Sequence, residues 1–156
     1  MKDEAIRFVI REARLLDEKR FDEWYELFTD DAYYWVPLTP GQPDPLQHNS
    51  LAYEDKLLLK LRVERLKSPR AHSQHPPSRC QHVLQASVVT MEDLAGGTCE
   101  LRTPFVYIEV RGERQVLLAG TCVHHLVKAA SAWRIRLKRV NLLDAGAPLP
   151  AIQLFP

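Results

Sequence analysis

The chain has 156 residues, of which 46% are hydrophobic and 26% are charged, and its formal net charge at pH 7 is +1. This length predicts one domain, residues 1–156, with a sizeable buried core. The near-zero charge predicts no binding to nucleic acid or to an anionic membrane surface, and no run approaches the roughly 18 apolar residues that a membrane span requires.

The chain opens on Met1-Lys2-Asp3-Glu4, which is a charged start to an amphipathic helix rather than an apolar secretion signal. Cysteine occurs three times, at Cys80, Cys99 and Cys122, and an odd number disfavours a framework of disulfides. We therefore expect a cytoplasmic protein with reduced thiols that lie as small buried hydrophobic residues on strands.

Two helices are predicted near the N-terminus. A first helix over residues 4–19 places apolar residues at three-to-four spacing along one stripe, namely Ile6, Val9, Ile10, Ala13 and Leu16. Asp22 has the residue type of an N-cap for a short second helix that ends near Phe28, with Trp24 on its inner side.

A strand, a loop and a third helix follow. The aromatic and β-branched run Tyr33–Val36 predicts a strand, which Pro37 stops. Residues 39–50 include three prolines and predict a long loop, of the kind that often carries contact surface. A third helix is predicted over residues 51–66, and its buried stripe is Tyr53, Leu57, Leu61 and either Val63 or Leu66.

From Cys80 onward the pattern changes from helical to alternating. Strands are predicted over residues 81–91, 98–110, 115–128 and 132–143, with a tight hairpin at Arg111–Arg114. Long strands joined by short turns favour one antiparallel meander that bends over the helices. The expected fold class is α+β, with N-terminal helices packed on a strongly curved, mainly antiparallel sheet.

The last predicted strand has two faces. One face is apolar (Trp133, Ile135, Leu137) and the other is basic (Arg134, Arg136, Lys138). The alternation then changes, because the apolar Val140 and Leu142 follow at the even-numbered positions that the basic residues occupy earlier in the strand. A bulge or a second buried surface near Arg139 would explain this change. The tail, residues 145–156, has no period, and its apolar end must be covered by the domain's own sheet or by a neighbour.

Two short patterns match half of an iron–sulfur motif. Cys80-x-His82 and Cys122-x-His124 both resemble the first half of a Rieske motif, but neither is followed by a Cys-x-x-His second half. His124 and His125 are adjacent on a predicted strand, so their side chains point to opposite sides and cannot share a metal. These patterns therefore predict no cluster on this chain.

Other common site motifs are missing from the sequence. His72-x-x-His75 lies in a Pro-rich segment with no carboxylate nearby in the sequence, which disfavours a mononuclear iron site there. The sequence has neither a glycine-rich phosphate loop nor a Gly-x-Ser-x-Gly nucleophile turn. We therefore expect no catalytic, metal-binding or cofactor-binding residues.

Four stretches, in this order, resemble the small (beta) subunit of aromatic-ring-hydroxylating dioxygenases. They are Glu12–Asp17 with Trp24; the strand end Trp35-Val36-Pro37; Tyr53-Glu54-Asp55 with Arg62 and Arg65-Leu66; and Pro77-Ser78-Arg79-x-x-His82. The resemblance runs from Glu4 to Leu143, although Cys80 stands where many relatives have threonine. It implies the cone-shaped fold shared with nuclear transport factor 2 and ketosteroid isomerase.

The resemblance also implies a place in an oxidoreductase of aromatic compound catabolism, which uses O2 and electrons derived from NAD(P)H. In that family three small and three large subunits assemble, and the large subunit carries the Rieske 2Fe-2S cluster, the mononuclear iron and the substrate. The small subunits contact one another as a homotrimer and support the large ones. We therefore expect a non-catalytic structural subunit that carries no cofactor.

The guanidinium groups of the arginines can pair with carboxylates of another subunit, although each could equally form a local salt bridge. The end of the first strand, which carries an aromatic residue and a proline, also suits a subunit contact. The interface candidates are Trp35, Pro37, Arg62, Arg65, Arg79 and Arg102. An alternative interpretation is a stand-alone isomerase or dehydratase of the same fold acting on a small hydrophobic ligand, by proton transfer in a pocket. That pocket would use Trp24, Asp31, Tyr53, Asp55 and His82. A third interpretation is a ligand-binding or scaffold domain without a redox partner.

Overall fold

The computed structural model describes residues 1–70, 76–147, 149 and 152–156. Its three described helices are α1 (Lys2–Asp17), α2 (Phe21–Tyr25) and α3 (Lys56–Lys67). The strands of the described residues are β1 (Phe28–Pro37), β2 (Ser50–Asp55), β3 (Arg79–Leu84), β4 (Val88–Asp93), β5 (Thr98–Arg111), β6 (Arg114–Ala129) and β7 (Ala132–Leu142).

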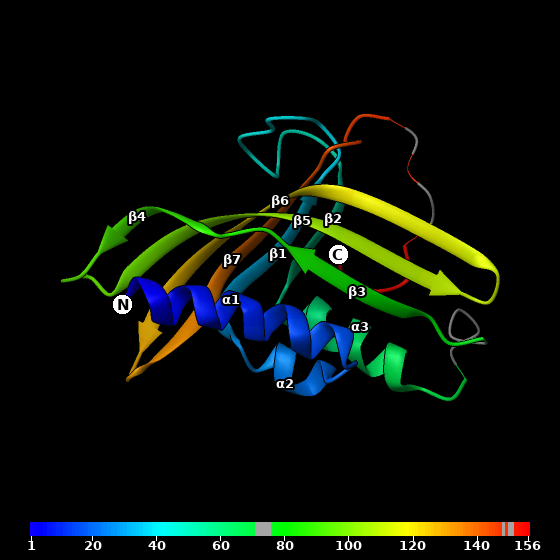
Figure 1. Ribbon diagram of the computed structural model, residues 1–156, viewed down its shortest axis with the longest axis horizontal. Helices are drawn as coiled ribbons and strands as arrows, with labels where there is room; N and C mark the ends of the chain where they lie inside the picture. Colours follow the sequence, from blue (N-terminus) through cyan, green and yellow to red (C-terminus); the bar gives the residue numbers. More distant parts are fainter. Residues whose placement is uncertain (71–75, 148, 150–151) are drawn as a thin grey trace.

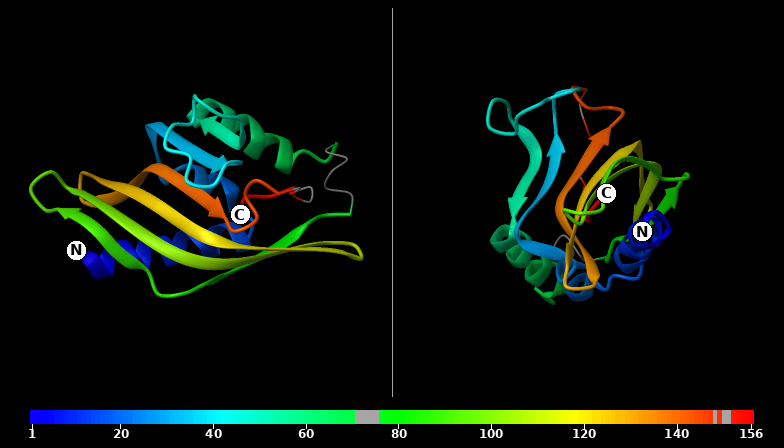
Figure 2. Two further views of the ribbon diagram at one scale, coloured as in Figure 1. Left: turned by 90° about the horizontal axis from the view of Figure 1, so that it is seen from above. Right: turned by 90° about the vertical axis from the view of Figure 1, so that its left-hand side faces the viewer.

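The strands form one sheet in the order β2-β1-β7-β6-β5-β3, and β4 pairs with β5 beyond the end of β3. Every pairing is antiparallel except that of β1 with β7, which is parallel. The sheet curves strongly, and the helices gather along one side of it (Figure 1, Figure 2). The α+β prediction of helices on a curved, mainly antiparallel sheet is confirmed.

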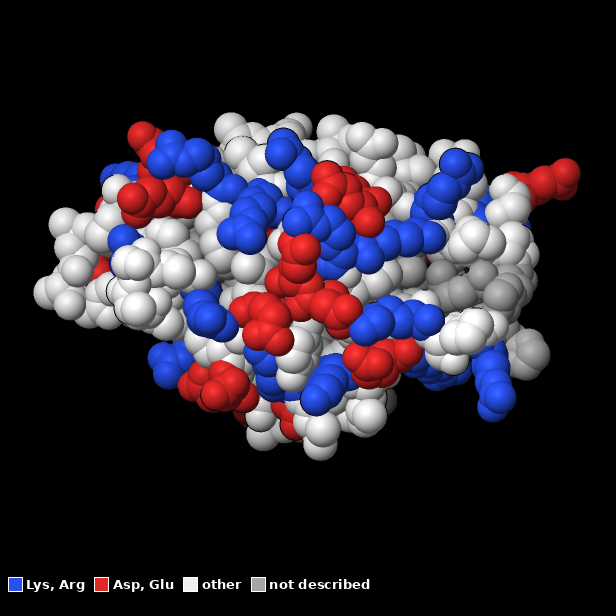
Figure 3. All heavy atoms as spheres, turned by 90° about the horizontal axis from the view of Figure 1, so that it is seen from below, with Lys and Arg blue, Asp and Glu red and all other residues white. Residues whose placement is uncertain are grey.

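Neither a patch of one charge on the face that carries the helices (Figure 3) nor a membrane-spanning helix is seen in the described residues. On the face that carries the helices, basic and acidic side chains interleave (Figure 3). No helix within the described residues is both long and apolar enough to cross a membrane.

The first helix buries most of its predicted stripe, but Ile10 is exposed, and Phe8 and Leu15 are buried instead.

The second helix and the first strand differ from their predicted bounds. α2 begins at Phe21 after the N-cap residue Arg20, and that N-cap makes no side-chain hydrogen bond, so the prediction that Asp22 caps the helix is wrong. β1 begins at Phe28 rather than at Tyr33, because the chain already pairs with β7 at Phe28. Packing between distant strands therefore decided where this strand begins.

The first part of the predicted third helix, residues 51–55, is a strand. Residues 50–55 form β2, which pairs antiparallel with β1 and brings Tyr53 opposite Trp35. The helix begins only after Asp55, whose carboxylate accepts a hydrogen bond from the Leu58 N–H at 2.9 Å. An N-cap of this kind satisfies one of the free N–H groups of the first turn, so it sets the helix start.

The predicted stripe of α3 is right at Val63 but wrong at Leu57 and Leu61. Leu57 and Leu61 are 65% and 59% exposed, whereas Leu59 and Val63 are buried against the sheet. Apolar residues occur on several sides of this helix, so spacing alone did not identify the buried side. The exposed leucines leave an apolar face on the surface of the isolated chain.

The strand predicted over residues 81–91 is two strands, β3 and β4, separated at residues 85–87. The break faces Pro104 of β5, which has no N–H to donate to a neighbouring strand. There the Gln85 N–H donates to the Pro104 carbonyl at 2.9 Å before the pairing resumes at Val88. The hairpin at Arg111–Arg114 is confirmed, with Gly112 at a φ of 59°.

The slipped alternation of β7 has a structural cause. Between His125 and Leu126 the register of β6 with β7 skips Arg136, which is a bulge. The bulge therefore lies at Arg136 rather than near Arg139. It rotates Lys138 and the apolar residues after it onto the core side, so the prediction that Lys138 lies on a basic outer face is wrong.

The tail is covered by the domain itself. Leu154 and Phe155 are buried, and the Phe155 ring lies among the aromatic residues of α2 and β1. The core thus combines the concave side of the sheet, the inner sides of the helices and the tail. The sequence left open whether the domain itself or a neighbouring chain covers the apolar tail, and in this structure the domain itself covers Leu154 and Phe155.

Candidate functional site: a buried polar network beneath the first helix

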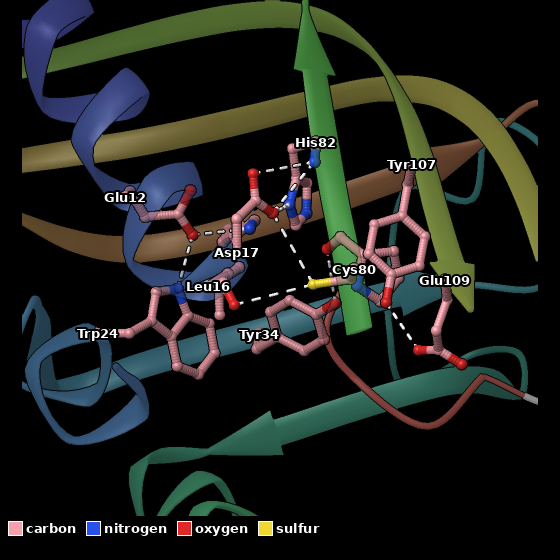
Figure 4. A network of polar contacts seen from close by, with 11 residues as sticks. Glu12, Leu16, Asp17, Trp24, Tyr34, Cys80, His82, Tyr107 and Glu109 are labelled. Atoms are coloured by element: carbon pink, nitrogen blue, oxygen red, sulfur yellow. Dashed lines mark hydrogen bonds and ion pairs between the residues drawn. The ribbon is translucent and has the colours of Figure 1, made fainter. Parts of the chain in front are cut away.

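Polar side chains meet in the core beneath α1 (Figure 4). Glu12 lies on the buried side of α1 and is 2% exposed. One of its oxygens, Oε1, accepts hydrogen bonds from Trp24 Nε1 and from Lys138 Nζ, each at 2.7 Å. Because the bulge at Arg136 turns Lys138 inward, the ammonium group faces this carboxylate directly.

The Glu12–Lys138 pair is ionised although it is fully buried. Burial opposes the charge on Glu12, but the Lys138 ammonium outweighs it and holds the pKa of Glu12 below its ordinary value. Burial likewise opposes the charge on Lys138, and Glu12 outweighs it and raises the pKa of Lys138. The result is an ion pair that links α1 to β7 through the interior.

His124 lies beside this pair as a neutral ring. Its Nε2 is 3.6 Å from Glu12 Oε2, and neither ring nitrogen has a hydrogen-bond partner within the described residues. Burial lowers the pKa of His124, and the Glu12 carboxylate offsets only part of that effect. His125, the next residue, faces outward toward Glu100, so the prediction that the two histidines point to opposite sides is confirmed.

A second group of polar side chains lies where α1 ends against β3. Asp17 Oδ1 is 2.7 Å from His82 Nδ1, and both carboxylate oxygens accept the His82 backbone N–H. The Cys80 Sγ lies 3.8 Å from Asp17 Oδ1. Burial, followed by the negative charges of Asp17 and Glu109, raises the pKa of the Cys80 thiol to about 12, so the thiol is protonated at neutral pH.

Glu109 ties β5 to the tail. Its carboxylate accepts hydrogen bonds from the Tyr107 hydroxyl at 2.7 Å and from the Leu154 N–H at 2.8 Å. The Gln153 N–H donates to the same carboxylate at 3.0 Å. Burial raises the pKa of Tyr107 far above its ordinary value, so this phenol stays a hydrogen-bond donor.

An aromatic cage holds Phe155. The ring centroids of Trp24 and Tyr34 lie 4.4 Å and 5.5 Å from that of Phe155. The Arg62 guanidinium lies over the same ring, 4.1 Å from its centroid, and donates to the Leu154 carbonyl at 2.8 Å. A segment of the same chain thus occupies the space between α2, α3 and β1.

The structure does not bring the five predicted pocket residues together. Trp24 is in the core, Asp31 is exposed and pairs with Arg136, and Asp55 caps α3. Tyr53 stacks on the ring of Tyr33, and His82 is bonded to Asp17. The largest of the described grooves, of about 560 Å³ between β2, α3 and the tail, is lined by none of these five.

The six interface candidates occupy three kinds of position. Trp35 and Pro37 are buried within the domain, and the Arg139 guanidinium covers the Trp35 ring at 4.2 Å. Arg62 holds the tail as described above, and Arg65 lines the same large groove. Arg79, at the start of β3, and Arg102, on β5, are exposed and face outward. Their role at an interface remains a prediction.

The described residues do not fit a Rieske cluster. All three cysteines are free. Cys122 and His124 lie on β6 and Cys80 and His82 on β3, and among the described residues only the latter pair joins a group of three possible metal ligands. His72 and His75 lie outside the described residues. No set of two cysteines and two histidines therefore assembles in the described part of the chain.

The sequence interpretation did not identify the polar contacts of five residues in the interior: Glu12, Asp17, Lys138, Tyr107 and Glu109. One signal was present for Glu12, which lies between Val9 and Leu16 on the apolar side of its helix. A charged residue in such a position indicates a buried partner. The sequence could not identify that partner, because the bulge that turns Lys138 inward depends on strand pairing.

Comparison with known proteins places this geometry in a family. A family model described as "Ring hydroxylating beta subunit" matches residues 11–146. The 2-halobenzoate 1,2-dioxygenase small subunit of Burkholderia cepacia is 38% identical over 146 residues, which cover 89% of this chain and 86% of that protein.

Solved structures agree on the fold. The beta subunit of benzoate 1,2-dioxygenase from Burkholderia mallei aligns with a TM-score of 0.75 at 26% identity, covering 95% of this chain and 93% of that one. A nuclear transport factor 2-like protein with a cystatin-like fold from Novosphingobium aromaticivorans aligns with a TM-score of 0.63 at 17% identity, covering 92% and 82%, which shows the fold alone.

Proposed function

Because this chain belongs to the ring-hydroxylating beta subunits of aromatic-ring dioxygenases, we propose that it is a non-catalytic structural subunit that supports assembly of the catalytic large subunits. The observation that carries this proposal is the filled interior. Phe155 occupies the aromatic cage, and the carboxylates beneath α1 are bonded to groups of the same chain. A substrate would have to displace Phe155 to enter the aromatic cage.

The partner in this proposal is a dioxygenase large subunit, with three small and three large subunits in the complex and contacts among the small ones. The Rieske 2Fe-2S cluster and the mononuclear iron reside on that partner, and electrons come from NAD(P)H through separate components. The lack of fit to a Rieske cluster within the described residues supports this division. Free cysteines support a reducing, cytoplasmic setting.

Two surfaces suit the contacts that such an assembly needs. The exposed leucines of α3, Leu57 and Leu61, form an apolar face that a partner subunit would cover. Arg79 and Arg102 present guanidinium groups that can pair bidentately with carboxylates of a neighbouring subunit. We assign these four side chains to intersubunit contacts.

The names of two relatives support a proposal for the substrate class. The two named dioxygenase relatives act, by their names, on 2-halobenzoate and on benzoate. We propose that the complex containing this chain hydroxylates a benzoate-type aromatic acid. Oxygen uptake by the reconstituted complex with benzoate and with benzene as alternative substrates tests this, and uptake with benzene alone would contradict it.

The assembly is tested by co-expressing the chain with the large subunit encoded next to it. The tagged chain is purified, and light scattering and iron analysis are performed on the eluate. We expect a complex of both chains that contains iron, and a purified small subunit that contains none when it is expressed alone. A chain that co-purifies with no partner and turns over a small hydrophobic ligand by itself would support the isomerase interpretation instead.

A further inference from the structure

A compact set of metal-ligand atoms lies at the junction of α1 and β3, away from the aromatic cage. Asp17 is the last residue of α1, and Cys80 and His82 are two apart on β3, so both β3 side chains point to the same side (Figure 4). One carboxylate oxygen, the thiol sulfur and one ring nitrogen all lie within 4.8 Å of one another.

The electrostatic surroundings of these three residues favour a cation. Asp17 stands at the C-terminal end of α1, where the helix dipole already contributes partial negative charge and an acidic side chain is disfavoured. The Leu16 carbonyl oxygen, at the same helix end, lies 3.8 Å from Cys80 Sγ. A positive ion at this point would interact favourably with the carboxylate, the carbonyl and the helix end together.

His82 presents one ring nitrogen to this group. Its side chain is 4% exposed, and Nδ1 is the nitrogen that faces the Asp17 carboxylate, at 2.7 Å from Oδ1. The buried imidazole therefore already directs a possible ligand atom at the carboxylate. Asp17 and His82 also line a groove of about 440 Å³ between α1 and the end of β3, which provides a path from solvent.

We propose that Asp17, Cys80 and His82 form a binding site for one divalent cation of the zinc type. The donor set of one carboxylate oxygen, one thiolate and one imidazole nitrogen is one that Zn²⁺ prefers, and three protein ligands leave a fourth position for water. On binding, the thiol releases its proton to solvent and the ring nitrogen that ligates the ion carries none.

The spacing of the ligand atoms is close to what such a site needs. Bonds of about 2.0–2.3 Å in a tetrahedron place ligand atoms roughly 3.3–3.8 Å apart. The Cys80 Sγ to Asp17 Oδ1 distance is 3.8 Å, and the 2.7 Å between Asp17 Oδ1 and His82 Nδ1 would widen slightly as the ion replaces that hydrogen bond. The ion would fasten α1 to β3.

Cobalt(II) tests the site, because a thiolate ligand gives it an intense charge-transfer absorption band. The purified full chain is treated with a chelator, dialysed and titrated with Co²⁺, after which Zn²⁺ is added as a competitor. We expect one Co²⁺ per chain with a thiolate band that Zn²⁺ abolishes. We also expect Zn²⁺ to raise the melting temperature of the chain, because it binds the folded state.

Substitutions show which residues give rise to the Co²⁺ absorption band. Cys80→Ser and His82→Gln should each weaken Co²⁺ binding by roughly 100-fold or more, since loss of an outer partner alone costs about 10–100-fold. Cys99→Ala, which removes a buried thiol on β5, and the double variant His72→Ala/His75→Ala should both keep the band. Far-UV circular dichroism of each variant shows whether it folds. Absence of a thiolate band in the wild-type chain, or its persistence in Cys80→Ser, would overturn the proposal.

Discussion

The buried Glu12–Lys138 pair can be tested by changing its charge without changing its shape. Glu12→Gln keeps an oxygen that can accept the Trp24 Nε1–H, but it leaves the Lys138 ammonium without a counter-ion in the core. At the observed separation of 2.7 Å and an effective dielectric constant of about 20, the lost attraction is about 6 kcal/mol. Removing one partner of a buried pair typically costs about 3–5 kcal/mol.

The measurement is urea denaturation of the isolated chain, followed by circular dichroism at constant pH. We expect the free energy of unfolding to fall by about 3–5 kcal/mol in Glu12→Gln. The double variant Glu12→Gln/Lys138→Met removes both charges and should recover most of that loss, since apolar replacement of a whole buried pair is often neutral. The coupling between the two sites is then obtained from the double-mutant cycle.

The matched control is Asp31→Asn, which neutralises the carboxylate of an exposed pair with Arg136. Exposed pairs contribute about 0–1 kcal/mol, so this variant should lose little stability. The reasoning is refuted if Glu12→Gln is as stable as the wild type, or if the double variant is no more stable than Glu12→Gln. Either result would mean that Lys138 finds solvent or another partner.

Three further predictions concern the tail, the pH dependence and the interface. Phe155→Ala should lower the free energy of unfolding by about 3–5 kcal/mol, because it empties a fully buried aromatic cage, and an unchanged denaturation midpoint would contradict this. The pKa of His124 is lowered by burial from 6.5, so stability should fall as pH drops below about 6.5, by up to about 1.4 kcal/mol per pH unit, and His124→Gln should reduce that slope. Arg79→Ala should loosen subunit assembly in light scattering while the melting temperature of the isolated chain stays unchanged, with Arg11→Ala as the exposed control; an intact, fully active complex would refute it.

The pH prediction has a definite sign. The unfolded chain binds a proton at His124 near pH 6.5, whereas the buried ring does not, so acid favours unfolding. Glu12 acts further down the scale, because its pKa is lowered from 4.5 on folding. Its contribution is present above about pH 4.5 and is lost as pH falls toward the folded-state value. Glu12→Gln should therefore remove the lower part of the acid transition.

The local pattern of the sequence determined much of this protein. The helical spacing of α1, the long alternating strands and the Arg111–Arg114 hairpin all follow from side-chain periodicity and from the preference of Gly112 for positive φ. These features, with the order of the family-like stretches, were sufficient to indicate a curved α+β fold of the right family.

Tertiary structure decided the features that depend on pairing at a distance. The sequence predicts residues 51–55 as helix, because Tyr53 falls at helical spacing with Leu57 and Leu61, but pairing with β1 makes them part of a strand. The bulge at Arg136 is fixed by the register of β6 with β7, and only that register turns Lys138 toward Glu12. The cage around Phe155 and the ligand group at Cys80 likewise join segments distant in sequence, which no local pattern can bring together.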